Sequence, residues 1–165
     1  MIELVVAIAA LAVAMTVVLV MLFPRADQGA QLLWQVRGAE LAGRILDELG
    51  QYPFDENSGE GGRIRCDEAG TSCTAPVDLG PDAGESLPAL FDDLDDFHGF
   101  GGQATSLLSD LPADYGQIQV GIQVVYDGNG DGVDDNAVGP HKLVRLALSL
   151  PGGDTLTFAR YRSNY

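Results

Sequence analysis

The chain opens with a long apolar run. From Leu4 to Phe23, Thr16 is the one polar side chain. About twenty residues in a helix span roughly 30 Å, which is the thickness of the hydrocarbon core of a bilayer. A helix that is apolar on every side is not typical of a soluble domain of this size. A cleaved secretory signal is disfavoured, because no basic residue precedes the run and no cleavage triplet follows it. We therefore predict a retained membrane-spanning or filament-core helix over residues 1–24.

One acidic residue, Glu3, stands at the start of this run. A carboxylate near the end of an apolar helix can reach the interface, where it costs far less than at the bilayer centre. Glu3 therefore has two interpretations. It either marks the membrane edge, or pairs with a cation such as the amino terminus of a neighbouring chain. The second interpretation would favour lateral association of helices into a bundle.

A second helical pattern, over residues 25–50, is amphipathic. Pro24 is expected to kink or break the helix between the two patterns, because proline lacks an amide proton and clashes with the preceding turn. Gly50 is suited to the C-terminal cap. Apolar residues recur at three- and four-residue spacing and should cover one face of a sheet; they are Leu32, Leu33, Val36, Ala42, Ile45, Leu46 and Leu49.

Residues 51–116 show no sustained period and are expected to form a long loop region. Such a long loop in a compact domain is usually stabilised by a covalent cross-link or by a bound ligand. The chain has two cysteines, Cys66 and Cys73, separated by six residues. Their spacing and number do not suit a zinc site. They either remain free thiols in a reducing compartment or form a disulfide, and a membrane helix ahead of them favours the disulfide and a head outside the cytoplasm.

Residues 117–165 carry strand patterns. Apolar and polar residues alternate from Gln117 to Val124, less strictly over 143–150, and again over 155–161 after a Pro-Gly-Gly-Asp turn. Consecutive short strands joined by tight turns form an antiparallel sheet. The predicted fold class is therefore α+β, with a long N-terminal helix packed on a small antiparallel sheet.

The stretch DGNGDGVDD lies between the first two of these strands. Oxygen-bearing side chains at alternate positions followed by glycine are typical of the start of a calcium-binding loop. The acidic residue that would close such a loop is absent, since Val138 stands at that position. A polar hairpin turn is the alternative interpretation. The candidate calcium ligands are Asp127, Asn129, Asp131 and Asp135.

A second acidic stretch is FDDLDDFHG, residues 91–99. Its apolar residues Phe91, Leu94 and Phe97 are three apart, which predicts one or two helical turns attached to the domain. The four aspartates among them are expected to form a solvated face, with a metal site as the alternative. His98 and His141 belong to no nucleophile motif, and we predict that the chain is not an enzyme.

The net charge of the chain argues against two classes of binding partner, nucleic acids and anionic lipids. The chain has 24 acidic and nine basic residues, for a formal net charge of −15. Such a polyanion repels phosphate backbones, so binding to nucleic acid is excluded. Attachment to anionic lipid through a basic surface is excluded for the same reason.

Several stretches carry a resemblance to a known family. The opening IELVVAIAALAVA, with its glutamate beside a long apolar helix, resembles the N-terminal region of type IV pilins and of the pseudopilins of type II secretion. Other stretches are similar to minor pilin-like proteins of the mannose-sensitive haemagglutinin (MSHA) pilus system. These stretches are the Phe-Pro after the apolar run, RGAELAGRILDEL, the cysteine pair, LGPDAGESLPALFDDLDDFHG and the terminal YRSNY.

This resemblance implies a pilin-like fold and a structural role. Such subunits sit in the inner membrane with a periplasmic head. They are then extracted by the pilus assembly machinery into an extracellular filament whose core is a bundle of apolar helices. Minor members initiate assembly or occupy the tip. By position Glu3 matches the family's glutamate, which pairs with the amino terminus of a neighbouring subunit.

The resemblance also sets one expectation and two alternatives. The family's processed leader ends in Gly followed by an aromatic residue, whereas here Met1 directly precedes Ile2 and Glu3. If the chain is processed as in this family, the nucleotides upstream of Met1 should encode a basic leader ending in Gly-Phe; the alternative is a protein that the prepilin peptidase does not process. The alternatives are a pseudopilin of a type II secretion system and a membrane-anchored, calcium-binding adhesion module.

Overall fold

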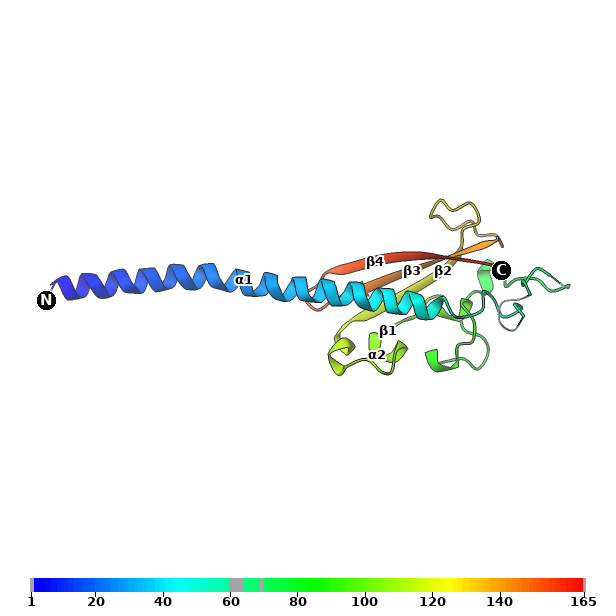
Figure 1. The fold of residues 1–165 in the computed structure, drawn as a ribbon, viewed down its shortest axis with the longest axis horizontal. Helices are drawn as coiled ribbons and strands as arrows, with labels where there is room; N and C mark the ends of the chain where they lie inside the picture. Colours follow the sequence, from blue (N-terminus) through cyan, green and yellow to red (C-terminus); the bar gives the residue numbers. More distant parts are fainter. Residues whose placement is uncertain (1, 60–63, 69, 165) are drawn as a thin grey trace. The chain divides into compact units, whose positions relative to one another are not determined.

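The computed structural model describes residues 2–59, 64–68 and 70–164, with the side chains of residues 22–28 excepted. It shows an α+β protein, which confirms the predicted fold class (Figure 1). A long helix, α1 (Ile2–Leu49), precedes a four-stranded antiparallel sheet. The chain divides into two compact units, Met1–Arg37 and Gly38–Tyr165, which are described separately here.

The sheet is a simple meander in the order β1-β2-β3-β4. Its long strands lie where the alternating patterns predict them. Val124 faces Val144 across one pair, and Leu146 faces Phe158 across the next. The short first strand was not predicted. The bounds are β1 (Gly101–Gln103), β2 (Gln119–Tyr126), β3 (His141–Ser149) and β4 (Thr155–Ser163).

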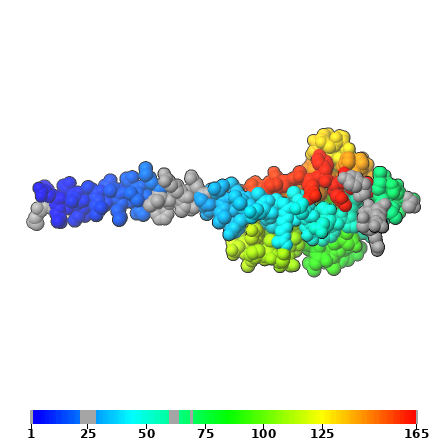
Figure 2. All heavy atoms as spheres, in the orientation of Figure 1, coloured from blue at the N-terminus to red at the C-terminus, as the bar shows by residue number. Residues whose placement is uncertain are grey.

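The last turns of α1 cover one face of this sheet. Leu41, Ala42, Ile45 and Leu49 are buried there. At Gly38 an added Cβ would come within 2.9 Å of Leu150, so the helix and the end of β3 approach closely. Figure 2 shows this part of α1 with β4 on one side and the segment around α2 on the other.

Two exposed ion pairs join these last turns to both neighbours. The guanidinium of Arg160 in β4 donates to the Asp47 carboxylate over 2.8 Å and to the Leu46 carbonyl over 2.9 Å. On the opposite side, Arg44 donates to the Asp110 carboxylate over 2.6 Å. Exposed pairs of this kind contribute little stability, so the burial of the apolar face holds this part of the helix in place.

The structure corrects two expectations about the helix. The chain forms one helix from Ile2 to Leu49, so the expected break does not occur at Pro24, whereas a kink there stays a prediction; the side chain of Pro24 lies outside the described residues. Of the predicted apolar stripe, Ala42, Ile45 and Leu49 are buried and Leu46 is partly buried. Its first three members, Leu32, Leu33 and Val36, are exposed. Periodicity identifies an apolar face but does not show how far along the helix another element covers it.

The region of residues 51–116 is not a plain loop. It contains elements of three to five residues, which are too short to produce a visible period. Their apolar residues pack together, with Phe91 and Phe97 in edge contact at 5.0 Å between ring centroids. The elements are η2 (Pro76–Asp78), η3 (Pro88–Leu90), η4 (Asp95–Phe97), β1, α2 (Ala104–Leu107) and η5 (Ala113–Gln117), whose last residue extends to position 117.

Candidate functional site

The apolar part of α1 is one candidate site. Among the described residues, one helical segment, Ile2–Met21, is long and apolar enough to cross a membrane. Its large apolar side chains are all half exposed or more, from 50% for Val17 to 80% for Ile2. Monomeric soluble proteins rarely expose a continuous apolar surface of this extent, so it indicates contact with lipid or with other helices.

The two polar side chains of Ile2–Met21 behave differently. The Thr16 hydroxyl donates to the carbonyl of Ala12, one turn earlier, over 2.8 Å. This bond satisfies the hydroxyl within the helix and makes it compatible with an apolar environment. Glu3 is exposed in the first turn and makes no hydrogen bond or ion pair with the residues that the structure describes. Its carboxylate is therefore available to an external cation.

The predicted disulfide between Cys66 and Cys73 is confirmed. It is buried in a small core with Phe54 and Tyr126. The Asn164 amide contacts both sulfur atoms, at 3.3 and 3.7 Å, so the disulfide also holds the end of β4.

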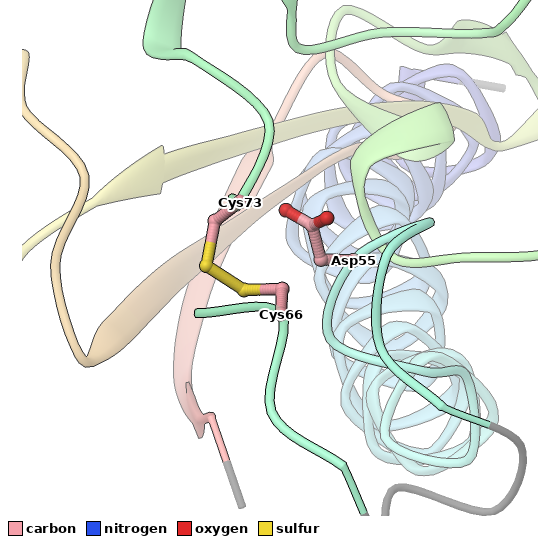
Figure 3. A group of neighbouring side chains, drawn as sticks. All are labelled: Asp55, Cys66 and Cys73. Atoms are coloured by element: carbon pink, nitrogen blue, oxygen red, sulfur yellow. A yellow bond between two sulfur atoms is a disulfide. The ribbon is translucent and has the colours of Figure 1, made fainter. Parts of the chain in front are cut away.

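The Asp55 carboxylate lies beside the disulfide, with ligand atoms of the three residues within 4.8 Å of one another (Figure 3). Asp55, Cys66 and Cys73 bring potential metal-binding atoms together, but both sulfurs are consumed by the bond between them. Metal ions bind thiolates, so this group is not a metal site in the oxidised protein.

The loop between β2 and β3 is organised around Asp127. One carboxylate oxygen of Asp127 accepts from the amides of Gly130 and Asp131. The other accepts from the amide of Gly132 over 2.7 Å and from the Tyr161 hydroxyl over 2.5 Å. The hydroxyl and the amides together lower the pKa of Asp127, because hydrogen bonds to the charged form favour it.

The other candidate calcium ligands bind neighbouring backbone groups. Asn129 accepts from the amide of Asp131, Asp131 accepts from the amide of Val133, and Asp135 accepts from the amide of Gly128. The loop thus places all four candidate residues in one short segment. In this arrangement their oxygens serve the turn itself, and calcium binding stays a prediction.

The prediction that the aspartates of residues 91–99 form a solvated face is wrong for three of the four. Asp93, Asp95 and Asp96 are each 3% exposed, whereas Asp92 is exposed. Asp93 accepts from the amides of Asp95 and Asp96, and so begins the short helix η4. Asp96 in turn accepts from the amides of Asp92 and Asp93. These carboxylates replace water as acceptors for a tight turn.

Asp96 belongs to a second carboxylate group, with Glu85 and Asp92. The pKa of Glu85 is raised to about 7, mainly by burial and to a smaller extent by the neighbouring Asp96 carboxyl. Carboxyl groups this close share a proton or a cation. The alternative prediction of a metal site among these aspartates therefore has a possible location, with no further observation in support of it.

The centre of the head contains a buried ammonium group that sequence reasoning missed. Lys142 in β3 is fully buried and is the single lysine of the chain. Its Nζ atom donates to the Phe54 carbonyl over 2.7 Å, to Asp55 Oδ2 over 3.2 Å and to Asp95 Oδ1 over 2.5 Å. The rings of Phe54 and Tyr126 lie over it at 4.2 and 5.0 Å.

The two carboxyl groups beside Lys142 have different protonation behaviour. Burial raises the pKa of Asp95 to about 7, even though Lys142 opposes the shift. Burial acts on Asp55 too, but Lys142 and the amides of Thr74 and Asn57 outweigh it and lower the pKa of Asp55. At neutral pH one carboxyl is therefore ionised and the other is close to half protonated.

A signal for Lys142 was present in the sequence. Side chains alternate between the two faces of a strand, so Lys142 lies on the same face as Val144, Leu146 and Leu148. All three are buried under α1 or beside it. The partners Asp55 and Asp95 could not be inferred, because they are 87 and 47 residues away and no local pattern relates them.

The two histidines make contacts within the fold. His98 Nδ1 lies 2.5 Å from the carbonyl of Val124, and His141 Nδ1 lies 2.8 Å from the Ser163 hydroxyl. Each joins neighbouring segments of the head.

No family model, curated protein or solved structure matches the chain. The functional interpretation therefore depends on the residues and on the resemblance described above.

Proposed function

We propose that the protein is a structural, minor pilin-like subunit of a type IV pilus of the MSHA type. It would assemble through the apolar helix Ile2–Met21. It would either initiate assembly or occupy the tip of the filament. Before assembly it would sit in the inner membrane as a single-pass protein with a periplasmic head. Its partners would be the pilus assembly machinery and the apolar helices of other pilin subunits.

One observation carries this proposal: the exposed apolar helix Ile2–Met21 begins with a carboxylate, Glu3, that has no partner among the described residues. A membrane anchor needs only the apolar surface, and in it Glu3 would mark no more than the membrane edge. A bundle of such helices buries the carboxylate away from water, where it gains most from a nearby cation. The amino terminus of an adjacent subunit would supply that cation.

The α+β head supports the same proposal without distinguishing its variants. A pseudopilin of a type II secretion system would have the same anchor and the same kind of head. A membrane-anchored, calcium-binding adhesion module is favoured by one specific feature, the aspartate-rich loop around Asp127. Calcium binding is therefore a second proposal, and it is compatible with either filament role.

The experiment replaces Glu3 by alanine in the full chain and measures recovery of the subunit in sheared filaments. We expect the head to fold as before, because Glu3 lies in the first turn of α1 and outside the compact unit Gly38–Tyr165. Incorporation should be lost. Glu3→Gln separates charge from polarity, since it keeps the shape and removes the ion pair.

Glu40→Ala is the matched control, because Glu40 is an exposed acidic residue on the same helix. It should leave incorporation unchanged. Normal incorporation of the Glu3→Ala subunit would refute the pairing role and leave the helix as a simple membrane anchor.

A further inference from the structure

The buried cluster around Lys142 has the composition of a reactive centre. An amine, a carboxyl group and a second carboxyl group meet in a core lined by Phe54 and Tyr126. Eight of the nine basic residues are arginines, and the one lysine is at this buried position. Arginine is the usual residue for a buried ion pair, whereas a lysine amine can lose its charge and act as a nucleophile.

As a simple ion pair the cluster is incompletely satisfied. Asp95 Oδ1 accepts from Lys142, but Asp95 Oδ2 is buried and has no hydrogen-bond partner among the described residues. A buried carboxylate oxygen without a donor is costly, because it has lost its water and gained nothing in exchange. Converting the carboxylate to a neutral amide removes this charge together with that of the ammonium group.

We propose that the Nζ atom of Lys142 becomes joined to the Cγ atom of Asp95 by an intramolecular amide bond, formed by condensation with loss of water. Asp55 carries the protons in this step. The bond connects β3 to η4 across 47 residues of sequence. It therefore closes a covalent ring that includes β1, α2, η5 and β2.

The atoms of the step balance. The reaction starts from the ammonium of Lys142, the carboxylate of Asp55 and the protonated carboxyl of Asp95. Asp55 takes one proton from Nζ, and the freed lone pair forms the bond to Cγ. One carboxyl oxygen of Asp95 leaves as water, with its own proton and a second proton from Nζ that Asp55 relays. Nζ keeps one hydrogen, Asp55 ends as a neutral acid, and no oxidant or cofactor is needed.

The surroundings favour this direction. At neutral pH part of the Asp95 population retains a proton, because burial raises its pKa to about 7, and a protonated carboxyl is the form that an amine can attack. The amine and the carboxyl are held within hydrogen-bond distance by three separate segments, which supplies the proximity that the reaction needs. The water that leaves is released from an apolar site, so the reverse reaction lacks its reactant.

The test is peptide mapping of the full-length protein after denaturation, reduction, alkylation and digestion with trypsin. An unreacted chain is cut after Lys142, since trypsin recognises the free amine, and yields the peptides 66–142 and 143–145. The bonded chain resists this cut and yields the single peptide 66–145, lighter by one water than its sequence. We expect the second result, together with loss of labelling of Lys142 by an amine reagent under denaturing conditions.

Three variants sharpen the result. Asp95→Ala removes the carboxyl that reacts, and Asp55→Asn removes the proton carrier, so both should restore cleavage after Lys142. Asp92→Ala is the matched control, because Asp92 is an exposed neighbour of the same stretch, and it should keep the bond. Cleavage after Lys142 in the denatured wild-type protein, with peptides of unaltered mass, would overturn the proposal whatever the variants do. The cluster would then be a buried ion pair.

Discussion

Asp93 illustrates how one buried residue sets a property of the whole head. Its carboxyl accepts from two amides at the start of η4 over 2.6 and 3.2 Å, which requires an acceptor but not a charge. The pKa of Asp93 is raised to about 6, mainly by burial and to a smaller extent by the negative charge of the nearby Asp96. The folded protein therefore holds a proton here that the unfolded chain releases near the ordinary pKa of aspartate, about 3.9.

From this shift we predict that Asp93 makes the head less stable as the pH rises from about 4 to about 6. The unfolded chain binds fewer protons in this range, so raising the pH favours unfolding. Asp93→Asn keeps the acceptor oxygen and removes the charge. It should be more stable than wild type at pH 7, by on the order of 1–2 kcal/mol after allowance for partial solvent screening.

The measurement is urea unfolding of both proteins at several pH values between 4 and 8. The two stabilities should converge as the pH falls toward 4, because Asp93 keeps its proton in the folded protein and the unfolded chain regains one near its pKa of about 3.9. A difference that stays constant across the range would show that the charge of Asp93 is not responsible.

At the scale of elements, α1 combines two kinds of surface in one helix. Its first part exposes apolar side chains on all sides, whereas Leu41, Ala42, Ile45 and Leu49 are buried under the sheet. The same propensity to form a helix thus produces one part exposed on all sides and one part buried against the sheet. Which environment each turn meets depends on the elements packed against it, and burial of the apolar face outweighs the exposed ion pairs of Arg44 and Arg160.

The loop between β2 and β3 is the element for which we predict calcium binding. Calcium takes six to eight oxygen ligands, so the oxygens of Asp127, Asn129, Asp131 and Asp135 would need water or a further carboxylate to complete the site. Calcium at about 100 times its Kd would stabilise the fold by about 2.7 kcal/mol and raise the Tm of the full chain.

Asp131→Ala should abolish this rise, while Asp78→Ala, an exposed aspartate in η2, should retain it. Thermal unfolding in detergent with calcium or with a chelator measures the effect. Equal melting curves in the two solutions would identify the loop as a plain polar turn.

At the scale of the whole molecule, charge and apolar surface are segregated. Glu3 is the one charged residue among positions 1–23, whereas nearly all of the acidic residues lie beyond position 46. Repulsion between the negative charges of two heads disfavours association of the protein in water. The exposed side chains of Ile2–Met21 oppose this, because they gain by leaving water.

We therefore predict that the purified full-length chain associates in water and becomes monodisperse in detergent. Light scattering after size-exclusion chromatography measures the mass of the protein in each solution. The detergent should act by covering Ile2–Met21, so the head should keep its circular dichroism spectrum on transfer. A monodisperse monomer in detergent-free water would contradict the proposed role of the helix.

Much of the fold was predictable because its signals are local. A run of apolar residues from Leu4 to Phe23 indicates a helix in an apolar environment, and strict alternation from Gln117 to Val124 indicates a strand. The disulfide was favoured over free thiols by two nearby cysteines and a predicted membrane helix before them. The short elements between residues 51 and 116 were missed, because three to five residues do not establish a period.

The sequence by itself determined the apolar helix, the three long strands and the acidic character of the head, since each follows from neighbouring residues. Only the tertiary structure decided which charged groups lose their water. Asp93 and Asp96 were expected in solvent, and Asp55, Asp95 and Lys142 come together from three distant segments. Burial and contact between such segments depend on how the whole head packs. The local pattern of a single stretch of sequence does not predict this packing.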